Sequence, residues 1–244
     1  MIISKISDYK NNIISLKIKD KSKKIKVNQI IRTSDGSDTI FVPELNEHYH
    51  SIHGAVQESA YIFISCGFDF CKADPINIFE VGFGTGLNAL LTAIKSNNGT
   101  REVNYTSIEK YPIDESIVKS LNHHQFAGDS GKEIFNSIHS AEWNHSVNIC
   151  RNFNLLKISG DFTKDILQGN YDLIYFDAFG PDKQPEMWTK EIFASIASVT
   201  NKNGILVTYS AKGEVKRNLN ASGFDVTLLP GPPGKRQIIR AVKK

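Results

Sequence analysis

Cysteine is scarce in this sequence, and its three cysteines form no CxxC motif. Cys66, Cys71 and Cys150 are an odd number, which favours neither a disulfide framework nor a thiolate metal site. The chain also lacks an apolar run near the ~18 residues that a membrane helix needs. Its first residues, MIISKISDYK, lack the apolar stretch of a signal peptide. These absences predict a cytoplasmic protein with no membrane partner.

No charge of one sign dominates the chain, whose net charge is only +3. The lysines and arginines are nevertheless clustered, with six lysines between residues 17 and 26 and five basic residues between 235 and 244. Such clusters can neutralise phosphates. A solvated hairpin and a frayed terminal segment are the simpler interpretation, so charge alone does not identify a nucleic-acid partner.

An alternation of apolar and polar residues marks the first ~55 residues as short strands. It runs through 13–20 and 23–33, and turn-forming residues at 34–38 precede a further apolar run at 39–42. We therefore predict a small β-rich N-terminal extension over residues 1–54.

The remaining residues, 55–244, alternate between helical and strand patterns. Apolar residues at helical spacing predict a helix over about 55–71, and a second helical pattern covers about 131–139 within the otherwise unassigned stretch 122–151. Strand patterns occupy 76–82, 104–110, 154–161, 171–179, 204–211, 224–230 and 236–242. This order predicts an α/β fold with a doubly wound, mostly parallel, seven-stranded, Rossmann-like sheet whose last strand is antiparallel.

A glycine-rich turn follows the first strand of the predicted sheet. Gly82, Gly84 and Gly86 allow close approach of a ligand to the backbone, and the helix that starts after them offers free amides. Because the turn lies between a strand and a helix, it is a stronger signal than a glycine motif alone. We predict that these glycines, with the preceding Glu80, bind a nucleotide cofactor.

Acidic residues also follow the next three strands of this predicted sheet. Glu109 can accept both hydroxyls of a ribose, and Asp161 can accept from an adenine amino group. Asp177 follows the fourth strand. Each of these acids alone is compatible with a helix cap or a solvated turn. Their equivalent topological positions favour a shared site at the carboxyl edge of the sheet.

The charge around this predicted site bears on the kind of cofactor. The loop reads GxGxG rather than GxGxxG, and Glu80 precedes it. A pyrophosphate is repelled by a nearby carboxylate, whereas a cofactor with an amino group and a sulfonium is attracted. The sequence therefore favours S-adenosylmethionine over NAD.

Several segments together resemble one enzyme family. EVGFGTG at 80–86, SIEK at 107–110 and YFDAFGPDKQPEMWT at 175–189 are similar to the methyltransferase part of the bacterial MnmC proteins. The blocks at 32–63 and 223–241 extend the resemblance on both sides. It implies a class I, S-adenosylmethionine-dependent N-methyltransferase that converts 5-aminomethyl-(2-thio)uridine to 5-methylaminomethyl-(2-thio)uridine at the tRNA wobble position. The family often carries a second, flavin-dependent domain, and we expect a stand-alone methyltransferase here, without that oxidoreductase domain.

The expected reaction is in-line transfer of the sulfonium methyl group to a neutral primary amine. An alkyl amine titrates near ~10, and a partly desolvated site lowers that value. Asp177 is our candidate for the group that orients the amine, with Phe179 and Pro181 shaping the catalytic pocket. Trp188 is expected either to stack on the uracil ring or to be a core aromatic.

The resemblance also indicates residues outside the strand ends. Tyr49, His50 and Glu58 lie in the family-like N-terminal block and are expected at the methionine end of the cofactor or at the substrate. Lys235 and Arg236 are expected either to contact tRNA phosphate or to be exposed charges of a hairpin turn. The histidines near residue 50 lack the HExxH spacing, so we expect no metal.

Three other functions remain open at this stage. A spermidine-synthase-like aminopropyltransferase shares the sheet, the glycine loop and the acid after the fourth strand, but it would need further acids near Asp177 for a diamine. An NAD(P)-dependent dehydrogenase and a non-enzymatic nucleotide-binding scaffold are the remaining alternatives. The sequence leaves the oligomeric state and the choice of tRNA open.

Overall fold

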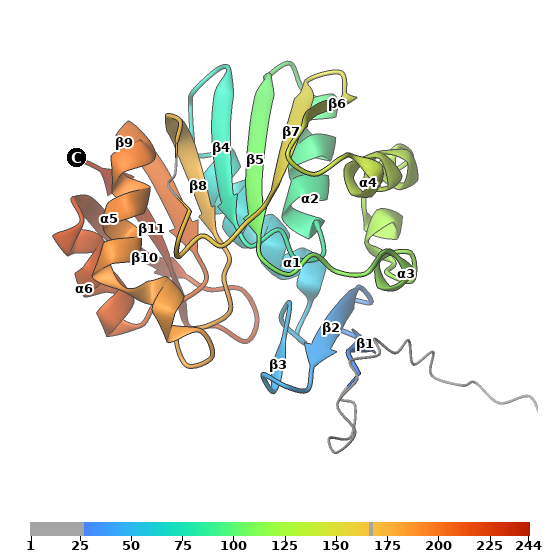
Figure 1. Cartoon of the computed structure of the whole chain (residues 1–244), viewed down its shortest axis with the longest axis horizontal. Coiled ribbons are helices and arrows are strands. Elements are labelled where there is room, and N and C mark those ends of the chain that lie inside the picture. Colours follow the sequence, from blue (N-terminus) through green and yellow to red (C-terminus); the bar gives the residue numbers. More distant parts are fainter. Residues whose placement is uncertain (1–26, 166–167) are drawn as a thin grey trace, which may run out of the picture.

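A computed structural model describes residues 27–165 and 168–244. Within them an eight-stranded sheet forms the centre of the molecule (Figure 1). Its strand order is β10-β11-β9-β8-β4-β5-β7-β6. The strands are β4 (Ile76–Val81), β5 (Val103–Glu109), β6 (Ser146–Cys150), β7 (Phe153–Ser159), β8 (Tyr171–Phe176), β9 (Thr200–Thr208), β10 (Phe224–Pro230) and β11 (Gln237–Lys243).

The directions of the strands confirm the doubly wound α/β prediction. Five neighbouring strands, from β9 to β7, are parallel, and β11 runs antiparallel to both β9 and β10. The predicted count of seven strands is wrong, because β6 adds an antiparallel edge strand beside β7. That strand lies in the stretch 122–151, where exposed and half-buried residues obscure the alternation.

Helices cover both faces of this sheet. One face carries α1 (Ala55–Ser59), η1 (Ala60–Phe68), α2 (Leu87–Asn97) and α4 (Gly131–Ser140), with the short α3 (Glu115–Val118) and η2 (His123–Phe126) nearby. The other carries η3 (Pro185–Trp188), α5 (Lys190–Val199) and α6 (Gly213–Ala221). Among the described residues, none of the helices is of a length and hydropathy that would let it span a bilayer.

The helix predicted over 55–71 differs from the observed one in its winding. After α1 the chain continues as the π-helical segment η1, and the helix ends at Phe68. The wider turn places consecutive residues, from Ile62 to Ile64 and from Cys66 to Phe68, in buried positions. The buried apolar face of η1 is therefore broader than the face that an α-helix of the same sequence would bury.

A small antiparallel sheet precedes these elements and lies below the main sheet in Figure 1. It contains β1 (Gln29–Arg32), β2 (Asp38–Val42) and β3 (Glu47–His48). The strand predicted at 13–20 and the lysine cluster at 17–26 lie outside the described residues. Within the described part, the β-rich character expected of the extension is present.

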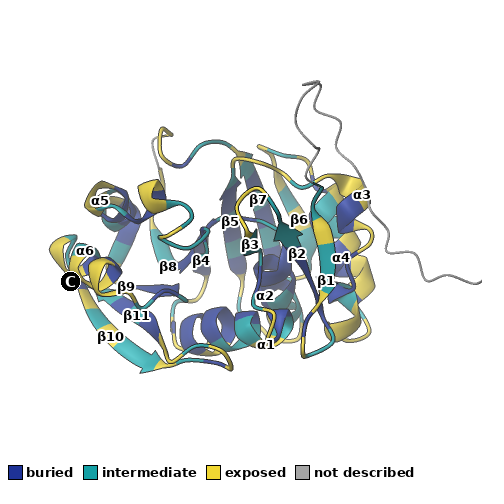
Figure 2. Ribbon diagram, turned by 90° about the horizontal axis from the view of Figure 1, so that it is seen from below, coloured by how far each residue is buried: buried dark blue, intermediate teal, exposed yellow. Residues whose placement is uncertain are grey.

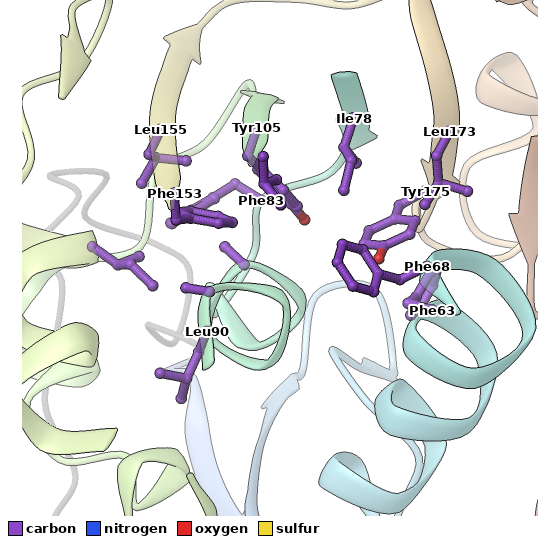
Figure 3. Packing of buried hydrophobic residues seen from close by; sticks show 14 of the residues in the cluster. Phe63, Phe68, Ile78, Phe83, Leu90, Tyr105, Phe153, Leu155, Leu173 and Tyr175 are labelled. Atoms are coloured by element: carbon purple, nitrogen blue, oxygen red, sulfur yellow. The ribbon is translucent and has the colours of Figure 1, made fainter. Parts of the chain in front are cut away.

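The core consists of two apolar clusters, one on each face of the main sheet. Figure 2 shows that burial concentrates in the central strands and in the sides of the helices that face them. Figure 3 shows the cluster on the α2 side, where Phe63, Tyr105, Phe153 and Tyr175 pack with aliphatic residues from the strands. The central strands are thus held from both sides, which fixes the positions of the loops at their carboxyl ends.

Candidate functional site

A cavity of about 1050 Å³ opens at the carboxyl edge of the main sheet. Its walls come from the loops after the parallel strands, from the small sheet and from the turn before β11. It is lined by most of the predicted site residues, namely Tyr49, His50, Glu58, Gly82, Gly84, Glu109, Asp161, Asp177, Phe179, Pro181, Lys235 and Arg236. The fold therefore brings residues from distant parts of the sequence to one site.

The glycine loop after β4 adopts backbone angles that favour glycine. Gly82, Gly84 and Gly86 have φ values of +90°, +49° and +71°. A Cβ on Gly82 would lie 3.0 Å from the carbonyl oxygen of Asp177, and one on Gly84 would lie 3.1 Å from the ring of Tyr49. The loop is thus pressed against two neighbouring parts of the site, and Gly86 turns the chain into α2.

Glu109, the last residue of β5, ties two loops together. Its carboxylate accepts the backbone N–H of Gly84 at 3.0 Å and that of Tyr111 at 2.8 Å. The side chain is half-buried and faces the cavity. A carboxylate fixed in this way can also accept the two hydroxyls of a ribose.

Asp161, after β7, lies in a strongly polar environment. It accepts the Thr163 hydroxyl at 2.7 Å and pairs with Lys110 at 3.0 Å and Lys164 at 3.5 Å. The hydrogen bond from Thr163, followed by the contact with Lys110, holds the pKa of Asp161 well below its usual range. The carboxylate is therefore ionised and already carries partners, so its contact with an adenine stays a prediction.

Two carboxyl groups share one amide at the centre of the carboxyl edge. The Nδ2 of Asn88 donates to Asp177 Oδ2 at 2.8 Å and to Glu80 Oε1 at 3.0 Å, and the Ser107 hydroxyl donates to Glu80 Oε2 at 2.6 Å. Burial raises the pKa of Glu80 to about 8, although both hydrogen bonds oppose the shift. Burial, followed by the nearby Glu80, also raises the pKa of Asp177.

This geometry changes the role expected of Glu80. The residue is fully buried and is not among those that line the cavity. A group with a pKa of about 8 is mostly protonated at neutral pH, so it supplies little negative charge to the loop. The structure therefore places Glu80 behind Asp177 as a support, rather than in the direct cofactor contact that the sequence predicts.

Aromatic side chains from both ends of the site meet beside the glycine loop. The rings of Tyr49 and Phe179 lie 5.0 Å apart, edge to face. His50 is buried, and its Nε2 lies 2.6 Å from the Thr85 hydroxyl. Burial lowers the pKa of His50 to about 3, so the ring is neutral. The contacts of His50 are with the protein itself, and its predicted substrate role stays a prediction.

The two basic residues before β11 differ in their surroundings. Lys235 pairs with Glu58 at 3.1 Å and lies 4.8 Å from the ring of Tyr209, with only a quarter of its side chain exposed. Arg236 is exposed at the same cavity. Burial raises the pKa of Glu58, and the charge of Lys235 opposes that shift. Lys235 is thus part of the cavity wall, and Arg236 is the one open to solvent.

Of the two roles expected for Trp188, the structure shows that of a core aromatic. It is 3% exposed, packs against Phe176 and Phe193, and donates its indole N–H to the Phe179 carbonyl at 2.7 Å. It does not line the cavity. The indole therefore fixes the loop that carries Phe179. In this structure it is not in a position to stack on a base.

Sequence reasoning missed two residues of the site, Asn88 and Tyr209. Asn88 is a polar residue on the buried side of α2, a signal that is available in the sequence. Tyr209 follows β9, as the predicted acids follow their strands, and its hydroxyl donates to the Ala178 carbonyl at 2.8 Å. Across 27–165 and 168–244, no cluster of three or more histidine, cysteine or acidic residues is arranged to hold a metal ion.

Comparison with known proteins gives the site its chemical context. A family described as S-adenosyl-L-methionine-dependent methyltransferase matches residues 128–244. The tRNA 5-methylaminomethyl-2-thiouridine biosynthesis bifunctional protein MnmC of Campylobacter hominis is 29% identical over 206 residues, covering 83% of this chain and 31% of that protein. The protein of the same name from Dichelobacter nodosus is 31% identical over 169 residues, covering 67% and 27%.

Solved structures agree with these matches. The crystal structure of MNMC2 from Aquifex aeolicus superposes with a TM-score of 0.74 at 27% identity, covering 89% of this chain and 70% of that one. Spermidine synthase from Thermotoga maritima superposes with a TM-score of 0.54 at 10% identity, which shows a shared fold only.

The sheet order, the glycine loop and the family match define a Rossmann-like methyltransferase that depends on S-adenosyl-L-methionine. The chain is, more particularly, an MnmC-like methyltransferase domain. It spans about a third of the length of the curated relatives that it matches.

Proposed function

We propose that this chain methylates the primary amine of 5-aminomethyl-(2-thio)uridine at the wobble position of tRNA, in the cytoplasm. The product is 5-methylaminomethyl-(2-thio)uridine. The name of the MnmC relatives, which concerns biosynthesis of this nucleoside in tRNA, supports the proposal. The 0.74 TM-score with the Aquifex protein supports the shared architecture.

The observation that carries the proposal is the position of Asp177. Its carboxyl group lies in the large cavity, one residue beyond the end of β8, and its backbone oxygen faces Gly82 of the glycine loop. Asn88 holds one carboxyl oxygen from behind. A hydrogen-bond acceptor is therefore fixed next to the loop that is expected to bind the methyl donor.

The residues present fit S-adenosylmethionine. We expect Glu109 to accept ribose hydroxyls, and Gly82 and Gly84 keep the loop free of side chains. Asp161 adds a charged acceptor on the wall of the same cavity. When bound, this cofactor supplies an electrophilic methyl group on a sulfonium.

The protein's part in the reaction is to position a neutral amine. The amine must lose its extra proton before attack, because an ammonium has no lone pair. Burial around Asp177 lowers the pKa of an amine bound there. A hydrogen bond from the amine N–H to Asp177 would then direct the lone pair toward the methyl group. Phe179 and Pro181 form the adjoining wall.

The RNA side of the proposal is supported by the cavity rim. Arg236 is exposed there, and it has no ion-pair partner within the described part of the chain. Tyr111, also on the lining, is 67% exposed. A free guanidinium and an exposed aromatic ring are groups that contact phosphates and unstacked bases of RNA loops.

The test is mass spectrometry of wobble nucleosides. tRNA that carries 5-aminomethyl-2-thiouridine is incubated with the protein and S-adenosylmethionine, then digested to nucleosides. We expect one added methyl group on that uridine with the wild-type protein and almost none with Asp177→Asn. Unmodified nucleoside after prolonged incubation, with the cofactor bound, would contradict the proposed substrate.

The aminopropyltransferase alternative is tested in a parallel reaction, in which decarboxylated S-adenosylmethionine replaces the methyl donor and putrescine replaces the tRNA. Two acids on the cavity wall already have basic partners, since Asp182 pairs with Lys212 and Glu58 pairs with Lys235. A third, Glu186, is exposed to solvent. This arrangement does not favour a second ammonium group in the cavity, and we expect no spermidine to form.

A further inference from the structure

A second cavity, of about 530 Å³, adjoins the glycine loop. Phe83 and Gly84 line both cavities, and the other walls come from α3, from β7 and from the end of α4 with the segment after it. Ligand pockets in proteins commonly have volumes of roughly 300–1000 Å³. The methyl-transfer chemistry described above uses none of the residues on the α3 and α4 side.

Lys157 is the unusual residue of this second cavity. It is only 1% exposed, yet it lines the cavity. Its Nζ donates to the His139 carbonyl at 3.1 Å and lies 4.9 Å from the ring centroid of Trp143 and 5.5 Å from that of Phe83. An ammonium has three N–H donors, and the His139 carbonyl is the one hydrogen-bond acceptor that the described residues give it. The two ring faces attract the charge without accepting a hydrogen bond, so two donors are left without an acceptor.

No carboxylate among the described residues pairs with this ammonium. Glu115 and Glu142 line the cavity, but their side chains are 77% and 76% exposed and are paired with Lys119 and His145. They therefore face solvent at the rim. Burial of Lys157 leaves a positive charge inside an aromatic wall with no internal counter-charge.

The neighbouring His139 adds no charge beside the Lys157 ammonium. Burial lowers its pKa to about 3, so the ring is neutral at pH 7. Burial also lowers the pKa of Lys157 to about 8, which leaves most of the ammonium protonated at neutral pH. The cavity thus offers one buried cation beside apolar residues, among them Ile113, Val118 and Ala141.

We propose that this second cavity binds a small organic carboxylate, with the carboxylate on Lys157 and the apolar body against Ile113, Val118 and Ala141. A charge-assisted hydrogen bond would satisfy the unused donors of the ammonium. The site is separate from the methyl-donor cavity, and the proposal does not depend on the identity of the methyl acceptor.

Benzoate is a suitable probe, with benzamide as its uncharged counterpart of the same shape. The chain contains two tryptophans, and Trp143 is the one in the cavity wall, whereas Trp188 is buried on the other face of the sheet. Tryptophan fluorescence and calorimetry are measured with saturating S-adenosylhomocysteine, which occupies the first cavity. We expect saturable benzoate binding, and benzamide binding at least about tenfold weaker.

Two variants locate the binding. Lys157→Met removes the charge, and Ala141→Phe fills the cavity without touching Lys157. We expect each to weaken benzoate binding at least about tenfold, with S-adenosylhomocysteine affinity within about threefold of the wild type. Lys95→Met, which removes an exposed lysine that does not line this cavity, serves as the control.

Several results would overturn the proposal. They are the absence of a saturable benzoate signal, equal affinity for benzoate and benzamide, and competition between benzoate and S-adenosylhomocysteine. Wild-type affinity in Ala141→Phe would also do so, whether or not Lys157→Met folds.

Discussion

The carboxyl edge of the sheet contains two pairs of acids in contrasting surroundings. At the ends of β5 and β7, Glu109 and Asp161 lie at the cavity rim among backbone N–H groups and lysines. On β4 and directly after β8, Glu80 and Asp177 are desolvated and share the amide of Asn88. One sequence signal, an acid at the end of a strand, predicts all four.

The contrast shows that an acid's position at the end of a strand does not determine whether that acid is ionised. β5 and β7 lie inside the sheet just as β4 and β8 do, but Glu80 is fully buried and Asp177 is held beside it by Asn88, so these two acids lose water and their pKa values rise. At the rim, Thr163 and Lys110 keep Asp161 ionised. We therefore expect Glu109 and Asp161 to hold polar groups of the cofactor, and Glu80 and Asp177 to handle a proton or an amine.

The largest effect is expected at Asp177. Asp177→Asn should lower the methyl-transfer rate by about 10²-fold or more, since it replaces the acceptor that orients the amine. Affinity for the cofactor should change by less than about threefold. Single-turnover kinetics and calorimetry measure the two quantities, with the exposed Asp225→Asn as the control. A variant with wild-type rate would remove Asp177 from the reaction.

The rim pair is tested by Glu109→Gln. The amide keeps the shape but loses the charge-assisted hydrogen bonds, so cofactor affinity should fall by roughly tenfold to a hundredfold. The rate at saturating cofactor should change far less than in Asp177→Asn. Calorimetry checks the first expectation, and Glu133→Gln, an exposed acid on α4, is the control. An unchanged dissociation constant would refute the ribose assignment of Glu109.

The protonation of Glu80 gives a smaller, pH-dependent effect. Since its pKa is raised from 4.5 to about 8, the unfolded chain releases this proton first, and the wild-type protein loses stability as the pH rises between those values. Glu80→Gln has no such loss. Its Tm relative to the wild type should rise between pH 5 and pH 8 by at least about 2 °C, the shift that roughly 1 kcal/mol produces at this size.

Thermal melts of Glu80→Gln and Glu133→Gln at pH 5, 6, 7 and 8 distinguish a pH dependence caused by Glu80 from one that any Glu→Gln substitution would produce. The exposed Glu133 should show no pH-dependent difference from the wild type. A Glu80→Gln curve parallel to the wild-type curve would mean that Glu80 is ionised in the folded protein.

The smallest effect is expected at the two basic residues before β11. Arg236→Ala should raise the KM for tRNA a few-fold and reduce the slope of log affinity against log salt by about 1. Lys235→Ala should instead lower the Tm, because Glu58 then loses its ion-pair partner. Equal changes in salt dependence for both variants would contradict the difference in their surroundings.

Much of the fold is predictable because the buried strands are continuous apolar runs. β4 and β8 are examples of such strands. The helix at 131–140 is predictable because its apolar residues recur at helical spacing. β6 does not, since an edge strand with half-buried residues lacks a clear pattern. The π-helical winding of η1 depends on contacts with strands far away in sequence, which a local period does not report.

The site is predictable to the extent that topology places it. The ends of parallel strands meet at one edge, so the sequence alone groups Glu109, Asp161 and Asp177. It does not indicate which acids lose water, or that Asn88 joins Glu80 to Asp177, because these follow from packing between α2 and two strands. The burial of Lys157 is likewise hidden, because lysine is almost always exposed, although this one shares the buried face of β7 with Phe153 and Leu155.

The strand order has a consequence for synthesis of the protein. β11 is made after both of its neighbours, β9 and β10, but it occupies the space between them. A nascent chain that has not yet released residues 237–243 from the ribosome therefore leaves the edges of both neighbours unpaired. Lys235, in the turn that leads into β11, is also made late, so the glycine loop is translated well before this wall of the cavity exists.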